Sequence, residues 1–150
     1  MTSISRYMRA DRRYCDGLLD LIEPLGRSGR WGEVQQALLA FRCALEQHLK
    51  REERVLLPAI EEAYGSSEAL LAMCRENDNV RGLLTAADAA SSRHDAQALS
   101  AVLSKLRVVM EQHNLHEESV LYPLADALLA DRAGDLLQAL EGRPSIMPVR

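Results

Sequence analysis

The sequence predicts an all-helical protein, an up-down-up-down four-helix bundle made from a duplicated helical hairpin. Three observations support this: apolar residues recur at helical spacing, glycine and serine breaks separate four long segments, and the two halves of the chain match each other. The chain has 150 residues, 47% of them hydrophobic, which suffices for one continuous core and is too short for two domains. We expect residues 1–132 to form the bundle and residues 133–150 to add a short helix and an irregular tail.

The internal match has a constant offset: adding 65 to a residue number in the first half gives its counterpart in the second. The register holds without a gap, which indicates two joined hairpins whose equivalent positions face each other. The clearest matches join Glu46-Gln47-His48 to Glu111-Gln112-His113, Glu52-Glu53 to Glu117-Glu118, Val55-Leu56 to Val120-Leu121, and Pro58 to Pro123.

The four helices follow from the breaks between them. The first is expected to end at the glycines of residues 26–32, and the second at Gly65-Ser66-Ser67, where a serine can cap the third. The third ends at a weaker break near residues 92–95, and short connections make neighbouring helices antiparallel. Pro58 and Pro123 lie inside the second and fourth helices and should bend each of them.

Polar residues interrupt the apolar stripes of the second and fourth helices. His48 and Glu52 are four residues apart, as are His113 and Glu117, so each pair lies on one inward face. An unpartnered carboxylate in an apolar core is costly, so these groups must meet cations, strong donors or a metal ion. The two stripes are Leu38, Phe41, Leu45, His48, Glu52, Val55, Ala59 and Leu103, Leu106, Met110, His113, Glu117, Val120, Leu124.

Two more residues are expected in the same layer. Counting from the helix ends at about 1.5 Å per residue places Arg12 of the first helix level with His48, and Asn77 of the third level with His113. Arg12 and Asn77 are themselves related by the 65-residue offset, so they occupy equivalent positions in the two halves.

A family resemblance rests on these residues. The segments HLKREERVLLP and HNLHEESVLYP resemble the paired signatures of the hemerythrin HHE cation-binding family, and MRADRRYCD resembles its opening segment. The resemblance covers nearly residues 3–130. It implies an antiparallel bundle around a non-haem di-iron site, with carboxylates such as Glu52 and Glu117 between the metals and histidines such as His48 and His113 beside them. Such domains are associated with oxygen binding, iron handling, and responses to nitric oxide or redox stress.

The sequence departs from the family pattern at two positions. Each repeat of the family contributes a further histidine from its first helix, and here those positions are Arg12 and Asn77. Arginine keeps its proton and does not bind a metal, whereas asparagine is a poor ligand for a transition metal. Asp11 and Glu76 lie close in sequence but do not occupy the family's ligand positions.

Several functions remain open at this stage. The leading hypothesis is a metal-binding protein, in oxygen, nitric oxide or redox sensing or in iron handling, with His48, Glu52, His113 and Glu117 as ligands. Four ligands favour one ion, or an asymmetric pair, with iron expected and zinc as a competitor. The alternative is a metal-free scaffold or partner-binding bundle in which Arg12 pairs with Glu52 and Glu117. A redox enzyme ranks lowest, because no substrate pocket is identifiable from the sequence.

Composition excludes other classes of partner. The net charge is −4 and no dense cluster of lysine or arginine occurs, so nucleic acid is not an expected partner. No apolar run has the length of a signal peptide or a membrane span, so a cytoplasmic protein is expected. Cys15, Cys43 and Cys74 lie within helical patterns, which indicates buried or redox-active thiols and not disulfides. The expected partners are a metal ion and a small diatomic ligand; no protein partner is identifiable.

Overall fold

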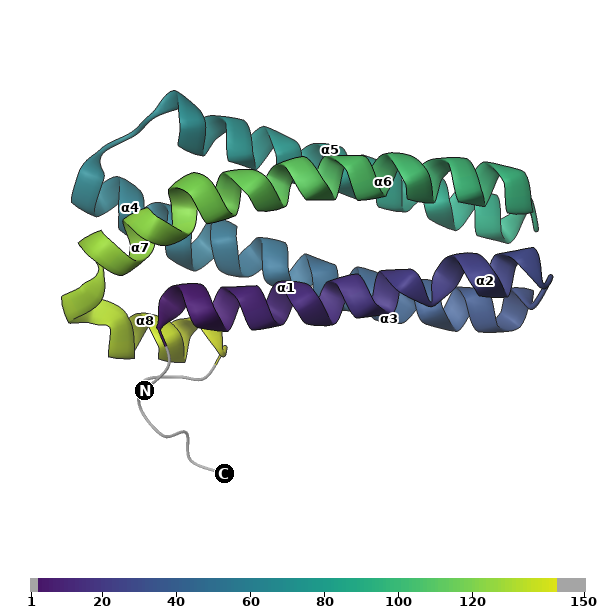
Figure 1. The fold of residues 1–150 in the computed structure, drawn as a ribbon, viewed down its shortest axis with the longest axis horizontal. Coiled ribbons are helices and arrows are strands. Elements are labelled where there is room, and N and C mark those ends of the chain that lie inside the picture. Colours follow the sequence, from purple (N-terminus) through teal and green to yellow (C-terminus); the bar gives the residue numbers. More distant parts are fainter. Residues whose placement is uncertain (1–2, 143–150) are drawn as a thin grey trace.

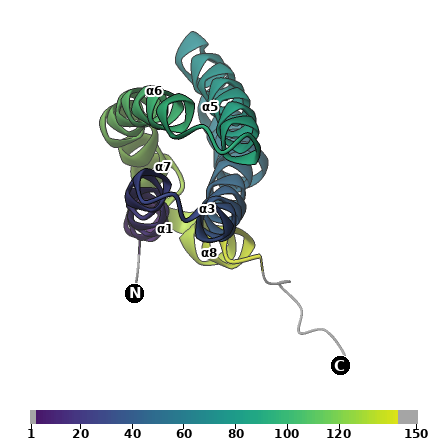
Figure 2. The same ribbon diagram turned by 90° about the vertical axis from the view of Figure 1, so that its right-hand side faces the viewer.

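The computed structural model describes residues 3–142, and no β-strand occurs among them. Four long helical segments run side by side along the molecule (Figure 1), and seen end-on each occupies one corner of a bundle (Figure 2). The all-helical, up-down-up-down prediction is therefore confirmed, while the duplication of a hairpin stays a prediction from the sequence. The elements are α1 (Ile4–Asp20), α2 (Ile22–Arg27), α3 (Trp31–Arg51), η1 (Glu52–Leu56), α4 (Leu57–Tyr64), α5 (Glu68–Ser92), α6 (Ala96–His116), η2 (Glu117–Leu121), α7 (Tyr122–Leu128), η3 (Ala130–Arg132) and α8 (Ala133–Leu140).

Polar side chains cap three of the long helices at their N-termini. Ser3 accepts a hydrogen bond from the backbone of α1, Ser67 from that of α5, and Asp95 from that of α6. Ser67 is the serine cap that the sequence predicts after Gly65, whose φ of 100° suits only glycine. None of the helices in residues 3–142 is long and apolar enough to cross a membrane.

The first corner of the bundle contains two helices in line. A single turn residue, Leu21, separates α1 from α2, and the chain then reverses through Gly29, whose φ is 70°. At this end of the bundle Trp31 stacks on His94, with ring centroids 5.2 Å apart and planes within 2° of parallel. This contact joins the first residue of α3 to the turn before α6.

The expected bends at the two prolines take the form of π-helical turns. α3 and α6 each pass into a π-helical segment, η1 or η2, before α4 or α7 begins with a proline at its second residue. In η1 the Leu57 N–H donates to the Glu52 carbonyl, five residues back, and η2 has the equivalent bond. Proline cannot donate a backbone hydrogen bond and crowds the preceding turn, so a wider turn accommodates it. Both wide turns begin at a buried glutamate.

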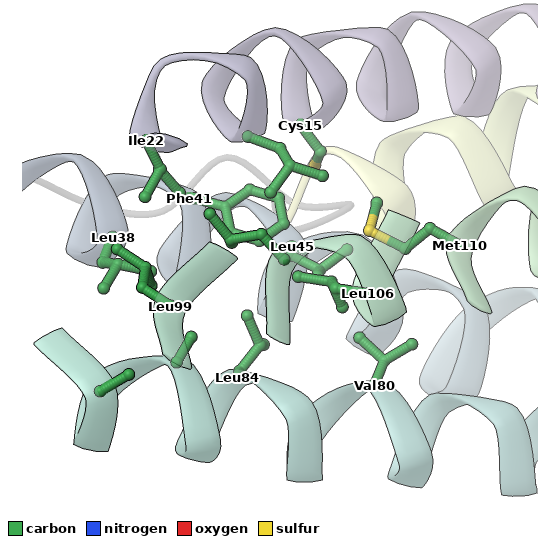
Figure 3. Packing of buried hydrophobic residues seen from close by; sticks show 14 of the residues in the cluster. Cys15, Ile22, Leu38, Phe41, Leu45, Val80, Leu84, Leu99, Leu106 and Met110 are labelled. Atoms are coloured by element: carbon green, nitrogen blue, oxygen red, sulfur yellow. The ribbon is translucent and has the colours of Figure 1, made fainter. Parts of the chain in front are cut away.

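Two apolar clusters fill the bundle, with the polar layer between them. The first lies between α1–α2, α3, α5 and α6, whose side chains meet in Figure 3. The second lies at the end formed by α4, α7 and α8. Near the layer, the first cluster includes Cys15, Leu45, Leu49, Val80 and Met110, and the second includes Met8, Leu56, Met73, Leu121 and Tyr122.

We expect Phe41→Ala to lower the free energy of unfolding by about 3–5 kcal/mol. Phe41 is fully buried in the first cluster, so its removal leaves a cavity (Figure 3). Urea unfolding measures the loss. The control is Leu39→Ala on the same helix, because Leu39 is 63% exposed and its truncation should cost less than about 0.5 kcal/mol. Equal losses in the two variants would contradict the assignment of Phe41 to the core.

The short helix expected near Gly134–Leu140 is present as α8. It packs on the second cluster through Leu136, Leu137 and Leu140, and its neighbours are α1 and η1. In Figure 1 it lies below α1, beside the N-terminal end of the bundle. The tail expected to be irregular, residues 142–150, lies outside the described residues except for Gly142.

Candidate metal centre

The four residues proposed from the sequence as ligands come together in the middle of the bundle. His48 lies near the C-terminal end of α3, one turn before Glu52, which is the first residue of η1. His113 and Glu117 have the same arrangement on α6 and η2. All four side chains are buried, and both carboxylates are fully inaccessible to solvent. The inward stripes of two helices therefore supply two imidazoles and two carboxylates to one enclosed volume.

The imidazole Nε2 atoms face the carboxylates. His48 Nε2 lies 3.1 Å from a Glu52 oxygen and 3.4 Å from a Glu117 oxygen. His113 Nε2 lies 3.1 Å from the other Glu52 oxygen and 3.6 Å from Glu117. One ligand atom each from His48, Glu52 and Glu117 fit within 4.8 Å of one another, a separation that suits binding to a single ion.

A further carboxylate, Asp11 or Glu76, contacts the Nδ1 atom of each histidine, on the side of the ring away from the centre. His48 Nδ1 lies 2.9 Å from an Asp11 oxygen, and His113 Nδ1 lies 3.1 Å from a Glu76 oxygen. A carboxylate on Nδ1 fixes the ring and directs Nε2 at the centre, as it does behind many metal-binding histidines. This role of Asp11 and Glu76 was not predicted from the sequence. The available signal was the offset of 65, which makes these two acidic residues equivalent.

Several atoms of the cluster have no hydrogen-bond partner among the described residues. They include both oxygens of Glu117, one oxygen of Glu52 and Nε2 of His48, whose contacts with the carboxylates lack hydrogen-bonding geometry. Buried polar atoms without partners are costly, and a carboxylate more so than a neutral group. A cation between these atoms would compensate them, so the donor set fits a metal ion.

Without metal, the charges of the histidines and carboxylates shift one another's pKa values. Burial lowers the pKa of His48, but the negative charges of Glu52 and Asp11 and the hydrogen bond to Asp11 outweigh it and raise the pKa to about 10. Burial raises the pKa of Glu52, but the two histidines outweigh it and lower the pKa to about 2. The pKa of His113 is also raised, because contacts with Glu52 and Glu76 outweigh its burial. The metal-free cluster therefore holds protons that a metal ion must displace.

The metal-free protein should lose stability as the pH rises from 6.5 towards 10. The His48 pKa is raised from an ordinary value of 6.5 to about 10 on folding. The stability that protonated His48 contributes is therefore complete below pH 6.5, declines between pH 6.5 and about 10, and is absent at higher pH. The loss should be on the order of a few kcal/mol. Urea unfolding with chelator at pH 6 and pH 9.5 measures it. His48→Gln should remove most of this dependence; an unchanged dependence in that variant would contradict the assignment.

Arg12 does not pair with Glu52 and Glu117, so that part of the alternative hypothesis is wrong. Its Nη1 lies 3.2 Å from Glu118, which also binds Nε of Arg9 at 2.8 Å. Glu118 follows Glu117 in the π-helical turn and points to the partly exposed edge of the bundle, where a long guanidinium reaches it without losing all its water. Arg12 therefore lies at the edge of the centre, and its guanidinium does not pair with the carboxylate of Glu117.

Asn77 is fully buried and lies beside the other carboxylate. Its Nδ2 lies 3.4 Å from Glu52 and 3.1 Å from Glu53, the residue that follows Glu52. Glu53 also forms a two-pronged ion pair with Arg81, with both distances 2.8 Å. Asn77 thus orients Glu52. Glu53 and Glu118, which follow Glu52 and Glu117 in the sequence, bind Asn77 and arginine side chains and not the imidazoles.

The three cysteines are all free thiols and lie outside the cluster of candidate ligands. Cys15 is buried, and burial raises the pKa of its thiol to about 11, which makes it unreactive. Cys74 is partly buried, and burial raises the pKa of its thiol as well. Of the two alternatives from the sequence, buried or redox-active thiols, burial does not hold for Cys43, which is exposed.

Fold and site together define a class of protein, the helical bundles whose core presents histidine and carboxylate side chains from facing helices, as metal-binding bundles do. The chain matches the hemerythrin HHE cation binding domain over residues 3–125, and it belongs to that family. Searches of curated proteins and of solved structures gave no match.

Proposed function

We propose that this protein binds a divalent metal ion through His48, Glu52, His113 and Glu117. The observation that carries the proposal is the environment of Glu117: its carboxylate is fully buried, faces two imidazoles, and has no hydrogen-bond partner on either oxygen among the described residues. A carboxylate in this position is compensated by a cation much better than by the apolar clusters on either side.

The charges of the four groups suit one divalent ion. Two ionised carboxylates carry two negative charges, and two histidines that donate Nδ1–H outward are neutral, so a divalent ion brings the cluster to neutrality. Arg12 and Asn77 replace the two further histidines of the family pattern, which leaves too few nitrogen ligands for a tight second ion. We expect iron as the physiological metal, with zinc as the competitor, since two nitrogens and two oxygens suit both.

The surroundings of the centre suit an ion with a role in sensing or iron handling. Two apolar clusters exclude water above and below it, and the outer carboxylates fix both imidazole rings. A bound iron ion would supply reversible redox chemistry and affinity for small diatomic molecules such as oxygen or nitric oxide. We place this function in the reducing cytoplasm, where free thiols such as Cys15 persist.

The test is metal content measured by elemental analysis, on protein purified without chelators from iron-supplemented cells. We expect close to one ion per chain, and less than a tenth of that in His48→Ala/His113→Ala. The control is His94→Ala, because His94 lies on the surface at the far end of the bundle and should leave the metal content unchanged.

A metal-free bundle is the second candidate. The observation in its favour is that His113 Nε2 and Asn77 Nδ2 both bond the same Glu52 oxygen, so that oxygen and His113 have hydrogen-bond partners without metal. It predicts that the wild-type protein stays empty after incubation with iron(II) or zinc(II) and dialysis. An empty protein under both conditions would establish this candidate and reject the first.

A further inference from the structure

One arginine connects the C-terminal helix to the candidate centre. Arg51, the last residue of α3, donates from Nε to the backbone carbonyl of Leu140 at 2.6 Å. Its Nη1 lies 3.0 Å from both oxygens of Asp11. The side chain is mostly buried, so these bonds form away from bulk water and hold the guanidinium in one orientation.

The bond to Leu140 holds the end of α8. Leu140 is the last residue of that helix, and its carbonyl is one of the terminal acceptors that have no partner within the helix. A guanidinium at this end also compensates the partial negative charge of the helix C-terminus. The Tyr7 hydroxyl donates to the same carbonyl at 3.4 Å, and the Arg51 guanidinium carbon lies 5.8 Å from the centre of the Tyr7 ring.

The bond to Asp11 connects Arg51 to His48, one of the candidate metal ligands. The Asp11 oxygen that binds Arg51 also lies 2.9 Å from His48 Nδ1, so three successive contacts of 3.0 Å or less join the last carbonyl of α8 to a candidate ligand. Burial raises the pKa of Asp11, but His48 and Arg51 outweigh it and lower the pKa, so Asp11 stays a carboxylate. Each partner restricts the orientation of the next, since every bond involves a charged group.

Among the described residues of the second half of the chain, no equivalent link joins a helix end to His113. The counterpart of Arg51 is His116, which is half-exposed and lies 2.7 Å from Glu76, the outer carboxylate behind His113. α8 packs on α1 and η1, which both belong to the first half of the chain. Among the described residues, the C-terminal end of α8 is therefore linked to His48 and not to His113. The asymmetry makes His116 a matched control for Arg51.

We propose that Arg51 is a positioning residue that couples metal occupancy to the docking of α8; the proposal rests on the metal-binding function above. A metal on Nε2 would fix the position of the His48 ring, and the Nδ1–H of that ring would in turn fix the Asp11 carboxylate and with it the guanidinium that holds Leu140. Coupling between two binding equilibria is reciprocal, so metal stabilises the docked helix and the docked helix raises metal affinity.

The test is hydrogen exchange of the α8 amides, residues 133–140, with and without saturating zinc(II). In the wild-type protein we expect zinc to slow exchange in α8 by about tenfold or more. Arg51→Gln and Asp11→Asn should each abolish this zinc-dependent change, because they cut the link at different contacts. His116→Gln should retain it. Saturating zinc keeps differences in affinity between the variants from affecting the comparison.

The outcomes separate the two proposals. Zinc uptake by the wild type with unchanged exchange in α8 would overturn the coupling and leave the metal site standing, as would a zinc effect that survives in both Arg51→Gln and Asp11→Asn. No zinc uptake by the wild type would overturn the metal site and the coupling with it. Asp11→Asn has the shape of the original side chain and provides the test if Arg51→Gln does not fold.

Discussion

Glu52→Gln is expected to reduce metal affinity more than about 100-fold, beyond the losses typical of residues behind the ligands. Glu52 is fully buried and is the only carboxylate within 3.1 Å of both imidazoles among the described residues. Glutamine keeps the shape but removes the charge that balances the ion, and it turns one acceptor into a donor directed at an imidazole nitrogen. The metal-free variant should also lose on the order of a few kcal/mol of stability, because protonated His48 loses the anion nearest to its Nε2.

Competition with a chromophoric zinc chelator measures the affinity, and elemental analysis measures the iron content. The matched control is Glu53→Gln, one residue further along the same π-helical turn, which removes a carboxylate that binds Asn77 and Arg81 but not the imidazoles. Its loss should be at most about tenfold. Comparable affinities for Glu52→Gln and the wild type would remove Glu52 from the ligand set.

Arg12→His combined with Asn77→His is expected to raise the metal content from about one ion per chain to about two. The two substitutions restore neutral nitrogen ligands at the positions where the family pattern has histidines. They also remove the guanidinium, whose fixed positive charge at the rim opposes a second cation. Asn77 already lies within 3.4 Å of Glu52, so a histidine there starts beside the carboxylate that the two ions would share.

The control for added histidines is Arg13→His with Asp78→His, at the exposed positions that follow Arg12 and Asn77. It has the same number of new imidazoles but directs them to solvent, so its metal content should equal that of the wild type. A gain in both double variants would indicate surface binding. No gain in Arg12→His/Asn77→His would mean that the space around Glu117 does not admit a second ion.

The fold was predictable because its determinants are local. Helical spacing of apolar residues, the glycines near residues 26–32 and the serine cap after Gly65 each act within a few residues, and all agree with the observed helices. The four polar residues of the centre were predictable for the same reason, since His48 and Glu52 interrupt an otherwise apolar stripe.

The partners of long side chains could not be predicted from helix geometry. The alternative hypothesis paired Arg12 with Glu52 and Glu117, but Arg12 binds Glu118, because the π-helical turn and the length of the arginine side chain allow contact at the partly exposed edge of the bundle, where desolvation costs less. The two π-helical turns were themselves missed. A proline indicates that a helix must adapt, but the choice between a kink and a wider turn depends on the packing of the surrounding helices.

By itself the sequence determined the helical bundle, the depth of its polar layer and the family to which the chain belongs, because these depend on periodicity and on spacing along the chain. Only the tertiary structure decided which groups meet across the bundle. Arg51 and Leu140 are far apart in sequence, and their contact exists because α8 folds back on α1 and η1. Such contacts depend on where a helix docks, a property of the packed molecule that no local pattern encodes.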